Sequence, residues 1–133
     1  MGKLLGDEFY TFCSIMSSDE DQPIVMDIYV GFTWREELAI TVDCHNYEDH
    51  RYDCSTSAIV NEQDARAMAR RHKVKYPQLP RFIADCMAEW REIINPDFRQ
   101  IADCFKEITE CLLDEGCRFR ITRTHGKDHS TCI

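Results

Sequence analysis

The sequence predicts an α+β fold: an antiparallel β-meander packed on one face by three helices. Residues 24–60 alternate apolar and polar side chains with a period of two, the pattern of strands with one buried face. From residue 61 to residue 116 the period changes to 3.6, and residues 117–124 return to a period of two. We therefore expect about four N-terminal strands, three helices and a C-terminal strand that joins the same sheet.

The size of the chain fits a single domain, residues 1–133, with a frayed tail from about residue 125. Its 133 residues and apolar content of 44% are enough for one closed core. The longest apolar runs are far shorter than the roughly 20 residues that cross a bilayer, so no membrane segment is expected. Asp7 and Glu8 interrupt the N-terminus before a signal peptide could form.

Three segments of the N-terminal half place even-numbered apolar residues on one face: 24–34, 38–45 and 52–60. A slip of one residue would turn a whole strand over, so the register follows from requiring all even residues to share a face. This rule pairs Cys44 with Cys54 and Trp34 with Leu38. It also turns Trp34 and Tyr52 toward the core.

Two outer segments complete the predicted sheet. Residues 9–17 are apolar but alternate poorly, so we expect them to pair at an edge. Residues 117–124 turn Phe119 and Ile121 inward and leave two arginines, Arg118 and Arg120, outside. These arginines could face carboxylates of the sheet: Asp27, Asp43 or Asp53.

Capping residues mark out the three helices. Asn61 can cap the first helix. The second is expected from about residue 80 to residue 94, and Pro96 suits the first position of the third, which ends at Gly116. The predicted inner faces consist of these residues: Ala65, Met68, Ala69, His72, Phe82, Ile83, Met87, Trp90, Ile94, Phe98, Ile101, Phe105, Ile108 and Leu112.

A repeat relates residues 81–92 to residues 99–110, an offset of 18 positions. This offset is about five helical turns, so the two copies share a face whether they form one kinked helix or a hairpin. Asp85, Glu89 and Glu92 of the first copy lie opposite the apolar stripe. This is the pattern of a solvated helix face, with a metal site or an acidic docking ridge as the alternative.

Negative charge is concentrated in the half assigned to the sheet. The chain has a net charge of −8, and residues 1–60 carry 3 basic side chains against 12 acidic ones. Such a surface repels a phosphate backbone, which disfavours direct nucleic-acid binding, and it attracts a basic protein surface. The candidate partner-binding residues are acidic side chains of the predicted strands and turns: Asp27, Glu36, Glu37, Asp43, Glu48, Asp49 and Asp53.

The cysteines offer a different kind of chemistry. Most of the eight fall on predicted apolar faces, where cysteine behaves as a small hydrophobe, so we expect reduced thiols in the cytoplasm. Cys44, His45, His50 and Cys54 surround one hairpin, which makes a small metal-binding or cysteine-dependent enzyme the alternative function. Because Cys44 and His45 point to opposite faces of a strand, we expect no metal and no cofactor there.

These observations favour a non-enzymatic protein-binding or regulatory module over an enzyme. Its size and acidity are those of small acidic inhibitors and nucleic-acid mimics, such as inhibitors of nucleases or of CRISPR effectors. The basic residues from Arg66 to Lys75 are what a helix C-terminus prefers, with contact to phosphate, RNA or an acidic partner as the alternative. The sequence leaves the oligomeric state open.

Overall fold

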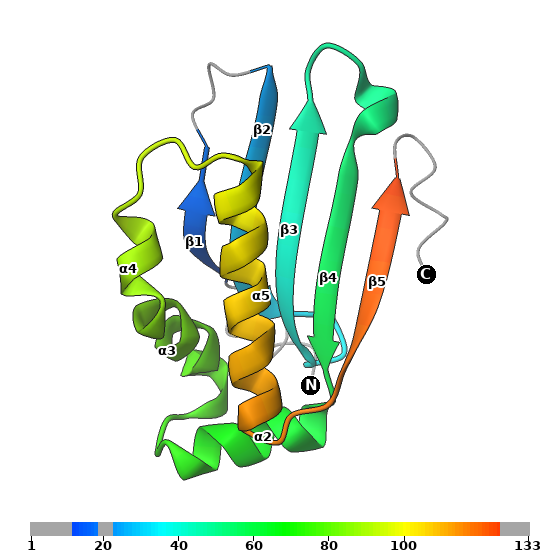
Figure 1. Cartoon of the computed structure of the whole chain (residues 1–133). Coiled ribbons are helices and arrows are strands. Elements are labelled where there is room, and N and C mark those ends of the chain that lie inside the picture. Colours follow the sequence, from blue (N-terminus) through cyan, green and yellow to red (C-terminus); the bar gives the residue numbers. More distant parts are fainter. Residues whose placement is uncertain (1–11, 19–22, 126–133) are drawn as a thin grey trace.

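The computed structural model describes residues 12–18 and 23–125. Within them, five strands form one antiparallel sheet in which each strand pairs with the next in the sequence. The strands are β1 (Cys13–Ser17), β2 (Ile24–Phe32), β3 (Leu38–Asn46), β4 (Cys54–Val60) and β5 (Phe119–His125) (Figure 1). The predicted α+β meander is therefore confirmed, with the segment before residue 17 at one edge and β5 at the other.

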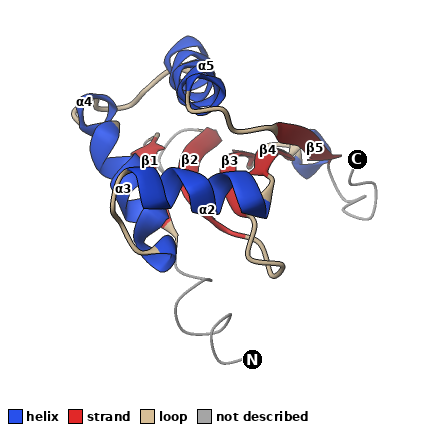
Figure 2. Cartoon of the chain, turned by 90° about the horizontal axis from the view of Figure 1, so that it is seen from below, coloured by secondary structure: helices blue, strands red, loops and turns tan. Residues whose placement is uncertain are grey.

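Helices cover one half of the sheet. They are α2 (Glu62–Arg71), α3 (Leu79–Cys86), α4 (Ala88–Arg91) and α5 (Phe98–Asp114). The helices α3 and α4 contact β1, and α5 lies over β2 and β3, while α2 crosses one end of the sheet (Figures 1 and 2). Figure 1 shows β4 and β5 beside α5 rather than behind it. We call the side of the sheet toward α5 the helix face and the opposite side the outer face.

The core lies between the helix face and the inner stripes of the helices. Even-numbered residues of β2, β3 and β4 supply most of the sheet side of this core, as predicted, and Ile28 and Ile40 have no exposed surface. On β3 the core is bordered by Val42, and the next even residue, Cys44, is half-buried and lies beyond it. The helix side is supplied by these buried residues: Ala65, Met68, Ala69, Leu79, Ile83, Ala84, Met87, Ile101, Cys104, Ile108 and Leu112.

The predicted register is confirmed at one end of the β3 strand and wrong at the other. Cys44 does pair with Cys54, but Leu38 pairs with Phe32 and not with Trp34. The reason is the side chain of Thr33, whose Oγ1 accepts hydrogen bonds from the backbone of Arg35 and Glu37, both at 3.2 Å. These bonds close a turn over residues 33–37, so Trp34 is 62% exposed instead of buried.

The predicted second helix is broken in two. The backbone leaves helical geometry at Met87, which separates α3 from α4. The third helix begins later than predicted, because Asp97 and Gln100 form a reciprocal capping box at its N-terminus. Ile94 and Phe98 therefore lie outside the core, contrary to expectation, with exposed fractions of 87% and 59%.

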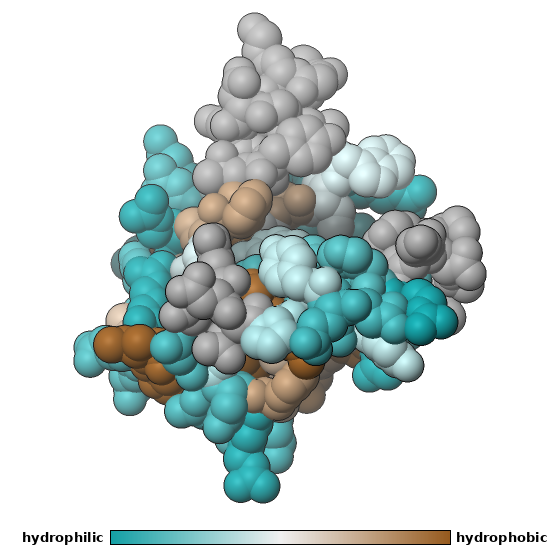
Figure 3. Space-filling model, turned by 90° about the horizontal axis from the view of Figure 1, so that it is seen from above, coloured by the Kyte–Doolittle hydropathy of each residue, from teal (hydrophilic) through white to brown (hydrophobic). Residues whose placement is uncertain are grey.

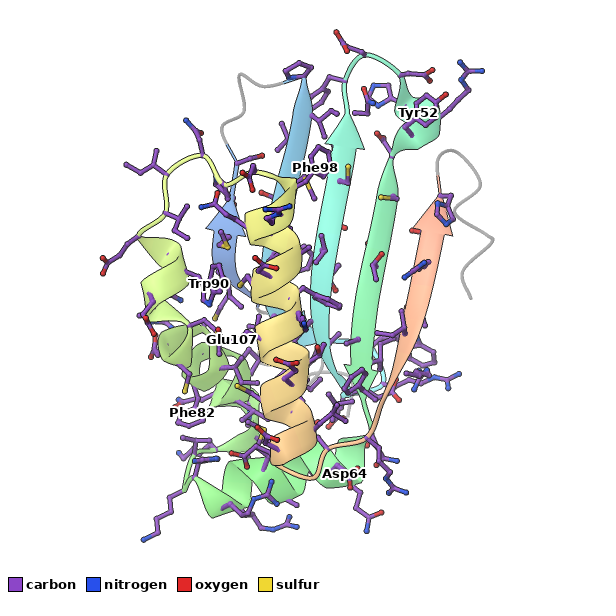
Figure 4. The ribbon with its side chains drawn as sticks, viewed as in Figure 1. Tyr52, Asp64, Phe82, Trp90, Phe98 and Glu107 are labelled. Atoms are coloured by element: carbon purple, nitrogen blue, oxygen red, sulfur yellow. The ribbon has the colours of Figure 1, made fainter. Side chains whose placement is uncertain are left out.

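The repeated segments form a hairpin, because α5 runs back alongside α3 and α4 (Figure 1). A hydrogen bond of 3.2 Å joins the two arms, from Trp90 Nε1 to Glu107 Oε2 (Figure 4). The repeated carboxylates are all exposed, as predicted for a solvated face: Asp85, Glu89, Glu92, Asp103, Glu107 and Glu110.

The arginines of the last strand do not face the carboxylates expected for them. Arg120 pairs with Glu37 at 3.2 Å, and Arg118 pairs with Asp64 of α2 at 3.1 Å. The reason is that β5 pairs with β4, which keeps Asp27 and Asp43 at least one strand away. Ile121 was expected inward and is 41% exposed, since α5 does not extend over this half of the sheet.

Two smaller predictions about side-chain burial are also wrong. His72 was placed on the inner stripe of the first helix, but its Nε2 lies 2.8 Å from a carboxylate oxygen of Glu115 at the surface. Tyr52 was turned toward the core, but it belongs to a 3-10 turn, His50–Tyr52, and is 67% exposed. The predicted tail after residue 125 and residues 9–11 of the predicted edge segment lie outside the described residues. Among the helices of the described part, none is long and apolar enough to cross a membrane.

Candidate functional site

The seven acidic residues predicted to bind a partner fall into three groups. Glu36 and Glu37 lie in the turn before β3, and Asp27 and Asp43 lie in the middle of the outer face. Strand β3 separates the first group from the residues beyond its other end by roughly 30 Å, at about 3.3 Å per residue. The structure therefore does not bring all seven together. The third group, at the far end, contains the remaining three: Glu48, Asp49 and Asp53.

The two glutamates of the turn before β3 are engaged within the fold. Glu36 accepts a hydrogen bond from Arg66 of α2 at 3.0 Å. Glu37 receives both terminal nitrogens of the Arg120 guanidinium at 3.2 Å. Their charges are thus largely compensated by arginines of this chain, which leaves little negative charge for a partner at this end of the sheet.

The two aspartates of the outer face lie directly opposite one another on β2 and β3. Asp43 is held by two hydroxyl groups, from Tyr29 at 2.9 Å and from Ser55 at 2.6 Å. Burial, and then the charge of Asp43, raises the pKa of the Tyr29 hydroxyl, so tyrosine stays a donor at neutral pH. Like charges opposite one another on a sheet repel, so Asp27 and Asp43 keep the centre of this face negative.

The connection between β3 and β4, residues 47–53, is held in shape by its own side chains. We call it the β3–β4 loop. The side-chain oxygen of Asn46 accepts the backbone N–H groups of Glu48 and Asp49, at 3.0 and 3.1 Å. Asp53 accepts the backbone N–H of Asn46 at 2.6 Å, which closes the base of the loop. These bonds are Asx-type turns, and they replace the ladder hydrogen bonds that end with the strands.

Ion pairs within the β3–β4 loop add to this order. The carboxylate of Asp49 binds Arg51 through both of its oxygens, with the shortest contact at 2.7 Å. The second oxygen of Asp53 lies 3.1 Å from Nδ1 of His50. Bidentate carboxylate–guanidinium contacts fix geometry as well as charge. With three carboxylates and one guanidinium, the loop remains negative.

Two tyrosines project from this ordered loop. Tyr47 and Tyr52 have exposed fractions of 59% and 67%. The ring of Tyr47 lies between the imidazoles of His45 and His50, with centroid distances of 6.5 and 6.0 Å. Figure 4 shows Tyr52 at the end of the molecule that carries this loop, and Figure 3 views the surface at this end, where pale and brown areas interrupt the hydrophilic surface.

Sequence reasoning found the carboxylates of the loop and offered Tyr47 as a contact residue, but it missed Tyr52. Assigning Tyr52 to a strand turned it inward. A signal was present, because Asn46, Asp49 and Asp53 stand at positions where their side chains can accept backbone N–H groups two or three residues away. Such spacing predicts a structured turn that leaves its other side chains outside.

The Cys/His set of the hairpin does not converge on one point. Cys44 and Cys54 share the helix face, His45 lies on the outer face, and His50 is bound to Asp53. Among the described residues, no three His, Cys, Asp or Glu side chains are placed to share a metal ion. This arrangement does not favour a tetrahedral metal centre.

The thiols are also poorly suited to nucleophilic catalysis. Burial, and then the neighbouring Cys54, raises the pKa of Cys44 to about 11. Burial likewise raises the pKa of Cys104 to about 12 and that of three other thiols above the ordinary value: Cys86, Cys111 and Cys117. Because the thiolate is the nucleophile, these side chains are mostly unreactive at neutral pH.

The basic residues of α2 and of the link that follows it are only partly available to a partner. Arg66 lies over the ring of Tyr76 and bonds to Glu62 and Glu36, and Arg71 is bound to Glu115 at 2.9 Å. These contacts fit the interpretation that the basic residues from Arg66 to Lys75 stabilise the C-terminal end of α2. Arg70, Lys73 and Lys75 are exposed, as are Arg71 and His72, which both contact Glu115.

The loop should respond to acid through Asp53. The N–H of Asn46, followed by His50, holds the pKa of Asp53 below its ordinary value. A lowered pKa means that the ionised carboxylate stabilises the folded loop above the unfolded value of about 3.9, and that this contribution is lost as the pH falls through the folded value. We expect the exchange protection of the Asn46 amide to fall in that range, as measured by NMR.

The variant Asp53→Asn should remove the acid response of the Asn46 amide, because its side-chain oxygen can still accept the hydrogen bond but does not titrate in this range. The matched control is Asp103→Asn, which removes an exposed carboxylate from α5 and should leave the acid response of the loop unchanged. An unchanged acid response in Asp53→Asn would rule out this carboxylate as the cause.

The function of this chain has to be argued from its own side-chain geometry and charge. No protein-family model, no curated protein and no solved structure matches the chain.

Proposed function

We propose that this chain is a non-enzymatic protein-binding module that engages a basic protein surface through its β3–β4 loop. The observation that carries the proposal is the combination of order and exposure in this loop. Its backbone is fixed by Asn46, Asp49 and Asp53, while Tyr47 and Tyr52 stay exposed beside the carboxylates. A surface that is already ordered loses little conformational entropy when it binds.

The side chains of the loop are those of a protein-interaction site. Tyrosine is enriched in interfaces and among the residues that dominate their energy, because it combines a large apolar ring with a polar tip. Glu48, which is exposed, can meet a lysine or arginine of the partner. Asp27 and Asp43 extend the negative region along the outer face and would steer a basic partner toward the loop.

In the narrower form of the proposal, the chain is an acidic inhibitor or nucleic-acid mimic that occupies the basic surface of a nuclease or CRISPR effector. The compartment proposed is the cytoplasm, where the seven cysteines of the described part would remain free thiols, as they are in the structure. Direct binding of nucleic acid is not part of the proposal, because the net charge of −8 opposes it.

The test uses the full chain as bait in extracts of its native host, with three variants in parallel. We expect Tyr47→Ala combined with Tyr52→Ala to weaken capture of a partner by at least about 2 kcal/mol of binding free energy. Glu48→Lys should weaken capture as well, and the wild-type interaction should decline as salt rises. The captured protein should have a basic surface.

The control variant is Trp34→Ala, because Trp34 is an aromatic residue of similar exposure, 62%, at the opposite end of the sheet. It should leave capture unchanged. Loss of the partner in Trp34→Ala, with full capture by the double tyrosine variant, would move the interface away from the loop and refute the proposal.

A further inference from the structure

One cross-strand row on the helix face consists entirely of side chains that bind soft metal ions. The register places Met26 of β2 opposite Cys44 of β3, Cys44 opposite Cys54 of β4, and Cys54 opposite His125 of β5. Because neighbouring strands lie about 4.8 Å apart, a thioether, two thiols and an imidazole follow one another across four strands. Thiolates and thioethers select Cu(I), and imidazole also binds copper.

The two thiols form the centre of this row. Cys44 and Cys54 are directly opposite one another, and the two thiols interact electrostatically. Two thiolates are sufficient ligands for an ion that accepts two-fold coordination, whereas zinc requires about four donors.

The position of the pair differs from that of cysteines that only fill a core. Both thiols are half-buried, and Cys44 lies one step beyond Val42, where the core cluster ends on β3. The carboxylates of Asp43 and Asp53 act on Cys44 electrostatically. Their negative potential attracts a cation and repels an anionic oxidant such as oxidised glutathione.

An opening lies next to the row. Met26 lines a surface pocket of about 420 Å³, together with Phe98 at the start of α5 and Ser18 after β1. Figure 4 shows Phe98 at the same end of the molecule as Tyr52 of the β3–β4 loop. A metal ion could therefore reach the thioether from solvent without unfolding the helix layer.

We propose that Cys44 and Cys54 are the primary ligands of a site for a soft monovalent cation of the Cu(I) class, with Met26 as a flanking donor. Binding replaces the two thiol protons: one Cu(I) ion and two thiols give a bis-thiolate copper complex of charge −1 and release two protons. The oxidation state of copper and sulfur does not change in this step.

The test is an anaerobic titration of the reduced full chain with Cu(I) held by a competing chromogenic chelator. We expect tight uptake of about one equivalent, as the row offers one pair of thiols. Cys44→Ser and Cys54→Ser should each lower the affinity by more than about a hundredfold, and Met26→Leu by about tenfold, as for loss of an outer partner. X-ray absorption at the copper edge should show sulfur neighbours in the wild type.

The matched controls are Cys86→Ser and Cys111→Ser, which remove exposed thiols from the helices. Both should bind copper as the wild type does, and circular dichroism of each variant checks that the chain remains folded. The proposal is overturned if the Cys44→Ser, Cys54→Ser double variant keeps the tight equivalent, or if zinc binds as tightly as Cu(I). It is also overturned if oxidised glutathione converts the pair to a disulfide while copper is not taken up.

Discussion

Replacing Ile40 by alanine should lower the free energy of unfolding by about 2 to 5 kcal/mol. Ile40 has no exposed surface and lies on the helix face of β3, the central strand of the sheet, between Val30 and Ala58. The shorter side chain loses its buried apolar surface and leaves a cavity that the helix layer cannot fill. Urea unfolding followed by circular dichroism would measure the loss, and an unchanged slope would show that only stability has changed.

The matched variant is Ile121→Ala, which makes the same chemical change on the same face of the sheet. Ile121 lies opposite Ala58 on β5 and is 41% exposed, because α5 does not extend over this strand. Replacing Ile121 by alanine should therefore lower the free energy of unfolding by less than about 1 kcal/mol. Equal losses for Ile40→Ala and Ile121→Ala would contradict the half-covered sheet.

The second large effect is expected at Tyr76, where replacement by alanine should lower the free energy of unfolding by about 3 to 5 kcal/mol. Tyr76 is 7% exposed and joins the link after α2 to the turn before β3. Its ring packs on Phe32 with a centroid distance of 4.9 Å, and the guanidinium of Arg66 lies 4.2 Å above it. Its hydroxyl donates to the backbone carbonyl of Glu36 at 2.6 Å.

The variant Tyr76→Phe separates these contributions, because it removes only the hydroxyl. We expect the free energy of unfolding to fall by about 1 to 2 kcal/mol, because the carbonyl of Glu36 loses this hydrogen-bond donor. Chemical denaturation of Tyr76→Phe and Tyr76→Ala under the same conditions gives both values. A loss in Tyr76→Phe as large as that in Tyr76→Ala would mean that packing of the ring contributes nothing.

The fold was largely predictable because its strongest signals are periodic. Alternation along β2, β3 and β4 identified the buried face, and the requirement that even residues share it gave the pairing of Cys44 with Cys54. The cap at Asn61 was also predicted, and its side chain accepts the N–H of Gln63 at 2.9 Å. These features depend either on a local pattern or on the single requirement that the even-numbered residues of these strands share a face. Both can be recognised in the sequence.

The errors share a different physical cause. A side chain that bonds to the backbone can end a strand or begin a helix inside a pattern that would otherwise continue, as Thr33 does after β2 and Asp97 does before α5. The exposure of Ile121 could not be read from its strand, because it depends on how far α5 extends across the sheet.

The candidate site was predictable only in part. The sequence supplied the acidic residues, but their distribution over two ends and one face of the sheet depends on the length of β3. The sequence also does not show which carboxylates are neutralised within the fold. Glu36 and Glu37 pair with Arg66 and Arg120, which are distant in the sequence. The row of soft donors likewise requires the register of four strands at once.

The half-covered sheet also implies that the two ends of the sheet differ in local stability. Val42 borders the core on β3, so the strand ends beyond it are held mainly by ladder and loop hydrogen bonds. Regions with few buried apolar contacts open locally at a lower free energy than the whole domain unfolds. The strand ends beside the loop can therefore separate while the opposite end, under α2, stays closed, and the loop then moves as one unit because its own hydrogen bonds keep its shape.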